Sequence, residues 1–135
     1  MRPHSIGRTW LASEYPIEAC NADGRTLGQT PNHSADLIHA HGVFVYTPFL
    51  VTYRYFEEIV RVAAPHSFVA FDVYSEPCLD EKTVADWLKA GDEYPCFLSN
   101  RYVIDFFTHR GFQKIHSFFM PYGAGRSEYL IFRRQ

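Results

Sequence analysis

Residues 36–72 carry the pattern that most constrains the fold of this chain, a strand, a helix and a second strand in sequence. Asp36-Leu-Ile-His-Ala40 and Phe68-Val-Ala-Phe-Asp72 are short apolar runs typical of buried strands. Between them, apolar side chains recur every three or four residues from Phe49 to Ala63, which predicts an amphipathic helix. The unit predicts a parallel sheet that binds ligands at the carboxyl ends of its strands. No Gly-x-Gly-x-x-Gly turn precedes it, so the usual phosphate-cradling loop is missing.

The rest of the chain predicts further elements of the same α/β class. We expect a first helix that ends at Tyr15-Pro16, a short strand Ile17–Asn21, helices that begin after Asp80 and after Ser99 or Asn100, and strands Ile115–Met120 and Glu128–Arg133. The turn between the last two strands is too short for a parallel crossover, so they should form an antiparallel hairpin. Pro65 is expected to end the helix of the central unit.

Composition indicates a single domain spanning residues 1–135. The net charge of −2 predicts neither a nucleic-acid partner nor an anionic membrane surface. No apolar run is long enough to span a membrane and no secretory segment is recognisable at the start, so the cytoplasm is the expected location. The three cysteines form no Cys-x-x-Cys pair, so we expect reduced structural thiols and no metal site.

The order of these parts resembles the class I S-adenosylmethionine-dependent methyltransferases. An Asp-Gly turn at Asp23-Gly24 is followed by "SADLIHAHGVFVY", by "YFEEIVRVAAPHSFVAFDV", by the helix–Gly–Phe unit "YVIDFFTHRGFQKI" and by a final hairpin. The resemblance implies a partial Rossmann-like sheet with helices on both faces and a C-terminal antiparallel hairpin. It also implies transfer of a methyl group from S-adenosylmethionine to a small molecule. The family's strand order is 3-2-1-4-5-7-6, and this chain would supply its later strands.

The resemblance also implies a set of cofactor-binding residues. In the family, an acidic residue after the third strand contacts the adenine, and the matching position here is Asp23, with Gly24 beside it in the same cofactor-binding turn. The turn after the fourth strand lies along the methionine part of the cofactor, and the matching positions are Ala40, His41 and Gly42. Asp23 has a second interpretation, because an Asp before Gly often closes its own turn.

Candidate residues for chemistry and substrate contact lie near the same strand ends. His41 could act as a general base because histidine titrates near neutral pH, and His39 is a weaker candidate. One of the two imidazoles could equally be a hydrogen-bonded core side chain. Tyr46 lies before the central helix, and Tyr74 and Glu76 follow the second strand, so these three are candidate substrate contacts.

The glycine loop and the first two strands of the family have no match in this sequence, so the domain is expected to be truncated at its N-terminus. The strand Asp36–Ala40, central in the family, would then lie at an open edge. We expect a homodimer, a complementing chain, or the Ile17–Asn21 strand to cover it. The alternative function is therefore a non-enzymatic scaffold that associates through this edge. The chain alone is expected to bind S-adenosylmethionine weakly or not at all.

Overall fold

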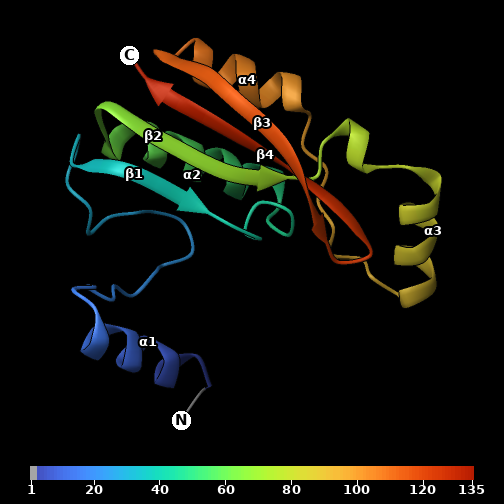
Figure 1. Cartoon of the computed structure of the whole chain (residues 1–135), viewed down its shortest axis with the longest axis horizontal. Helices are drawn as coiled ribbons and strands as arrows, with labels where there is room; N and C mark the ends of the chain where they lie inside the picture. The colour runs from blue at the N-terminus through green and yellow to red at the C-terminus, as the bar shows by residue number, and fades with distance from the viewer. Residues whose placement is uncertain (1–2) are drawn as a thin grey trace.

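The computed structural model describes residues 3–135, in which one four-stranded sheet is the central element. Its strands are β1 (Ala35–Ala40), β2 (Ala63–Val73), β3 (Phe112–Tyr122) and β4 (Gly125–Arg134), in the order β1-β2-β4-β3 (Figure 1). β1 and β2 are parallel, and β4 is antiparallel to both of its neighbours. The expected parallel unit and terminal hairpin are confirmed, and the order matches the 4-5-7-6 half of the methyltransferase sheet.

The connection from the central helix into β2 differs from expectation. Helix α2 (Phe49–Val62) passes directly into β2, so Pro65 lies inside the strand and does not end the helix. β2 bulges here, since Ala35 pairs with Ala63 but Leu37 pairs with Phe68. A bulge breaks the ladder locally and so tolerates a proline that cannot donate a hydrogen bond.

The two helices that follow β2 begin at the expected capping residues. Helix α3 (Glu81–Ala90) begins after Asp80, whose carboxylate accepts the Thr83 N–H at 2.9 Å, and it ends at the left-handed Gly91. Helix α4 (Asn100–Thr108) begins after Ser99, and a short 3-10 turn, η1 (Glu76–Cys78), follows β2. Helix α1 (Pro3–Glu14) stands apart from the sheet in Figure 1. Among residues 3–135, no helix combines the length and apolarity needed to cross a membrane.

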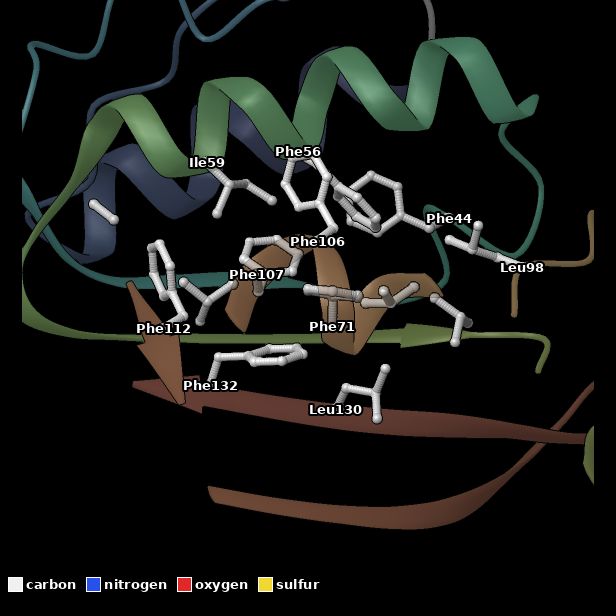
Figure 2. Close-up of a cluster of buried hydrophobic side chains, with 14 residues drawn as sticks. Phe44, Phe56, Ile59, Phe71, Leu98, Phe106, Phe107, Phe112, Leu130 and Phe132 are labelled. Carbon is white, nitrogen blue, oxygen red and sulfur yellow. The ribbon is translucent and has the colours of Figure 1, made fainter. Parts of the chain in front are cut away.

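The core lies between one face of the sheet and helices α2 and α4. Figure 2 shows phenylalanines from both helices meeting those of the strands. Phe107 of α4 contacts Phe56 of α2 and stacks on Phe132 of β4, with ring centroids 5.1 Å and 4.8 Å apart. Both helices therefore share one face. On the opposite face Leu37 is 67% exposed and Phe68 42% exposed, so that face is open at these positions of β1 and β2.

The expected strand Ile17–Asn21 does not form. Residues 17–23 carry no strand pairing, and Ile17 is 47% exposed. A strand needs a neighbour for its backbone groups, and these residues have not moved alongside β1. β1 is thus an edge strand of the sheet within the described residues, as expected for the Asp36–Ala40 segment.

Candidate functional site

The carboxyl ends of β1 and β2 lie side by side and place a turn against a buried carboxylate. β1 ends at Ala40, and the chain turns at Gly42, whose φ of +67° is in the left-handed region that favours glycine. The Gly42 N–H donates to Asp72 Oδ1 of β2 at 2.7 Å. This hydrogen bond fixes the turn to the neighbouring strand.

A second contact reaches the same turn from the hairpin. A Cβ atom added at Gly42 would lie 2.5 Å from the hydroxyl oxygen of Tyr122, the last residue of β3. A side chain at this position would therefore require Tyr122 to move, in addition to the strain of the positive φ. The Tyr122 ring also packs edge-on against His41, with centroids 5.4 Å apart.

Asp72 is fully buried and only half satisfied. Its Oδ1 holds Gly42, whereas Oδ2 has no hydrogen-bond partner among the described residues. Oδ2 lies 3.7 Å from Nδ1 of His41, whose side chain is 46% exposed. A buried carboxylate oxygen without a partner is costly, and such groups concentrate at functional sites.

Tyr129 of β4 links His41 with Phe118 of β3, across the strands of the sheet. Its hydroxyl shares a hydrogen bond with His41 Nδ1, and its ring stacks on His41 and on Phe118. Tyr129 lies on β4, opposite Asp72 of β2. The tyrosine can reach β1 because the β2 positions beneath its path, Ala70 and Asp72, carry small side chains.

Three tyrosines near Asp72 have hydroxyls with raised pKa values. Burial raises the pKa of Tyr74, Tyr122 and Tyr129, and the negative charge of Asp72 raises each of them further. All three are therefore neutral hydrogen-bond donors near neutral pH. The cluster around His41, formed by His41, Asp72, Tyr74, Tyr122 and Tyr129, offers electron-rich rings and one buried negative charge. Such an environment favours a cationic ligand.

The structure brings five of the predicted site residues together. Ala40, His41 and Gly42 form the end of β1 and its turn, and the Tyr46 and Tyr74 rings meet edge-on with centroids 6.3 Å apart. Tyr46 is 44% exposed, so it can be reached from solvent. Tyr74 is fully buried, and its hydroxyl has no partner among the described residues.

Asp23 and Gly24, the predicted adenine-binding residues, do not lie at the turn after β1. Asp23 accepts hydrogen bonds of 2.7 Å from the Arg25 N–H, the Thr26 N–H and the Thr26 hydroxyl, and these bonds hold the pKa of its carboxyl below the usual range. Asp23 therefore closes its own turn, the second interpretation of this residue.

The segment after Asp23 is fastened to the end of α2. The Leu27 N–H donates to Glu58, and the Arg61 guanidinium donates to the carbonyls of Leu27 and Thr30. That end of α2 lies at the amino ends of the strands, because α2 leads directly into β2. β1 is six residues long, or about 20 Å. The predicted adenine and methionine positions thus lie at opposite ends of β1.

Glu76 already has partners at the start of α4. Its carboxylate accepts the Ser99 hydroxyl at 2.6 Å and the Asn100 N–H at 3.1 Å. Burial acts to raise the pKa of Glu76, but these hydrogen bonds outweigh it and the pKa is lowered. The side chain fastens the residues after β2 to the helix, and its contact with a substrate stays a prediction.

Three members of the cluster were not selected from the sequence. Asp72 was recognisable only as an acidic residue at a strand end, and Tyr122 and Tyr129 only as hairpin residues. Their contacts with His41 and Gly42 join positions far apart in the chain, so no local pattern marks them. Within the described residues, no three histidine, cysteine or acidic side chains converge as metal ligands would.

Comparison with solved structures identifies the fold. The chain superimposes on an S-adenosylmethionine-dependent methyltransferase from Methanosarcina mazei with a TM-score of 0.67 and 11% identity, covering 98% of this chain and 78% of that one. It matches magnesium protoporphyrin IX methyltransferase from Synechocystis, solved with bound S-adenosylhomocysteine, with a TM-score of 0.68 and 12% identity over 94% of this chain and 57% of that one. A protein from Bordetella parapertussis matches with a TM-score of 0.68 and 13% identity over 98% of this chain and 51% of that one.

The chain thus has the fold of class I S-adenosylmethionine-dependent methyltransferases and spans about half to three quarters of the length of these structures. No protein-family model matches the sequence, and no curated protein sequence matches it.

Proposed function

We propose that this chain carries the methionine-facing part of an S-adenosylmethionine-dependent methyltransferase site, at the turn after β1. The observation that carries the proposal is the Gly42 turn, held by Asp72 at the carboxyl end of a strand in a methyltransferase-type sheet. In open α/β sheets, ligands generally bind at the carboxyl ends of the strands, which supports this choice. Solved structures of the same fold hold S-adenosylhomocysteine, as the Synechocystis enzyme does.

The residues around the turn fit this cofactor. When bound, it supplies a methyl group on a positively charged sulfur. Gly42 gives the turn its left-handed backbone, and the buried charge of Asp72 with the nearby tyrosine rings favours a cation.

His41 is the proposed base. If the acceptor carries a proton, His41 would take it up as the methyl group is transferred. Asp72, 3.7 Å away, would stabilise the imidazolium that results. Tyr46, partly exposed beside the turn, is the proposed contact for a small-molecule acceptor, and the cytoplasm is its proposed setting.

The test is an NMR titration of the isotope-labelled chain with S-adenosylhomocysteine, methionine and adenosine. The expected result is millimolar binding of the first two, with amide shifts concentrated at 40–42. Unchanged amides at 40–42 under saturating ligand would overturn the proposal. Adenosine tests the adenine role of Asp23 separately, since Asp23→Ala should abolish its shifts only if the carboxylate binds the base.

A second candidate function rests on the open edge of the sheet. Leu37 of β1 is 67% exposed beside backbone groups that no other strand pairs within the described residues. Such an edge is a template for pairing with another chain. The chain could thus serve as a scaffold that forms a homodimer or accepts a complementing chain through β1.

A further inference from the structure

A pocket of about 250 Å³ lies outside the cluster around His41, between α3 and the loop at 92–98. Its lining comes from α3, which Figure 1 labels, and from residues that follow the carboxyl end of β2. Its walls are predominantly apolar and aromatic, and they come from Tyr74, Leu79, Val84, Trp87, Leu88, Pro95, Cys96 and Phe97. A volume of this size suits a ligand with a single ring.

The walls of the pocket are held in place before any ligand arrives. On the helix side, Trp87 packs against the buried Tyr74 with ring centroids 4.9 Å apart. On the loop side, the Leu98 N–H donates to the Tyr74 carbonyl at 2.9 Å and the Cys96 N–H to the Val45 carbonyl at 2.8 Å. A preformed pocket spares a ligand the entropy cost of ordering its walls.

The charges of the pocket have one sign. Asp92 and Glu93 complete its lining, which contains no lysine, arginine or histidine. Asp92 follows the left-handed Gly91 that ends α3, and its N–H donates to the Trp87 carbonyl at 2.9 Å. Among the described residues, neither carboxylate forms an ion pair. Burial raises the pKa of the Cys96 thiol, so this lining residue stays neutral.

We infer that this pocket binds a small aromatic ammonium ion, with its ring between Trp87 and Phe97 and its charged nitrogen toward Asp92 and Glu93. Aromatic walls supply apolar contact and attract cations to their faces, and the two carboxylates select the positive charge. The inference goes beyond methyl transfer and does not depend on it. Tyr74 lines this pocket and also contacts Tyr122 of the cluster around His41.

The test uses Trp87 fluorescence. A Trp10→Phe chain keeps Trp87 as its single tryptophan, because the sequence has two and Trp10 is exposed on α1. Three probes of similar size differ in charge: phenethylammonium, 2-phenylethanol and phenylacetate. The expected result is saturable quenching by phenethylammonium with a dissociation constant on the order of 1 mM. The neutral probe should bind about three- to fivefold more weakly, and the anion more weakly still.

Two variants separate the charge effect from the apolar effect. Asp92→Asn with Glu93→Gln should bring the cation and the neutral probe to equal affinity. The control, Glu18→Gln with Glu57→Gln, changes the net charge by the same amount at positions outside the lining and should leave the preference for the cation unchanged. Phe97→Ala, at a side chain 51% exposed, should weaken all three probes. Equal binding of cation and neutral probe to the parent chain, or no saturable quenching, would overturn the inference. Failure of cofactor binding at Gly42 would leave it intact.

Discussion

Gly42 is constrained in two independent ways at the residue scale. Its φ of +67° disfavours any side chain, and the Tyr122 hydroxyl occupies the space of a Cβ atom. The turn must keep both features to present its N–H to Asp72. Gly42 is thus needed for the shape of the turn at which cofactor binding is proposed.

Gly42→Ala is expected to lower the free energy of unfolding by about 2–3 kcal/mol, measured by urea denaturation, because the backbone strain and the clash add. Gly24→Ala is the matched control, since Gly24 has a φ of +76° and nothing within 4 Å of its Cβ position. It should cost only the strain, about 1 kcal/mol. Equal losses in the two variants would show that Tyr122 moves aside freely.

The buried hydroxyl of Tyr74 should make the stability of the protein depend on pH in the alkaline range. Burial raises the pKa of its hydroxyl, so the native state keeps the proton while the unfolded chain loses it near pH 10. The native state then binds more protons than the unfolded state, and stability falls as pH rises above about 10. Tyr74→Phe should make the unfolding free energy fall less steeply with pH, by the slope that corresponds to about one proton, when urea denaturation is measured across that range.

At pH 7, Tyr74→Phe should be neutral or stabilising, because it removes a buried hydroxyl that has no partner among the described residues. Tyr94→Phe is the control, since Tyr94 is 74% exposed and should change neither quantity. A clear loss of stability in Tyr74→Phe at neutral pH would mean that the hydroxyl has a partner in solution.

At the scale of elements, the start of α4 depends on a side chain from the loop after β2. Glu76 accepts hydrogen bonds from Ser99 and Asn100, and it places a negative charge at the helix N-terminus. Glu76→Ala should therefore lower stability by about 1 kcal/mol in thermal or urea unfolding. Glu57→Ala, at an exposed position of α2, is the comparison and should have little effect. If Glu76→Ala left the stability unchanged, the Glu76 side chain would not be needed for the helix and would be available to contact a substrate.

The edge strand β1 predicts self-association. Leu37 is 67% exposed at an edge that no strand covers within residues 3–135, so light scattering should detect dimers or larger species. Leu37→Lys should restore the monomer, because a charge on an edge strand opposes pairing. Leu50→Lys, at an equally exposed leucine on α2, should not. A monomeric parent chain whose Leu37 and Ile38 amides exchange quickly would contradict the prediction.

At the scale of the whole molecule, the chain holds the 4-5-7-6 half of a methyltransferase sheet without the glycine-rich loop. That loop would supply backbone donors to the cofactor. Calorimetry of the chain with S-adenosylmethionine should therefore give a dissociation constant weaker than about 100 µM. Low-micromolar affinity would mean that another segment of this chain replaces the loop.

The sequence by itself determined the elements whose signals are local. Helix periodicity marked α2, Asp80 and Ser99 marked the starts of α3 and α4, and the short connection at Pro121–Gly125 required the antiparallel hairpin. Each depends on residues within a few positions of one another. The shared methyltransferase order then placed the turn at Ala40–Gly42 at the carboxyl end of a strand.

Only the tertiary structure decided which side chains meet at that turn. Asp72, Tyr122 and Tyr129 come from three different strands, and their approach to residues 41–42 depends on sheet order and on the small Ala70. The structure also decided that residues 17–23 form no strand, because a strand requires a neighbour that local propensity cannot supply. Local patterns fix elements, whereas a site is fixed by contacts between residues that the chain brings together only when it folds.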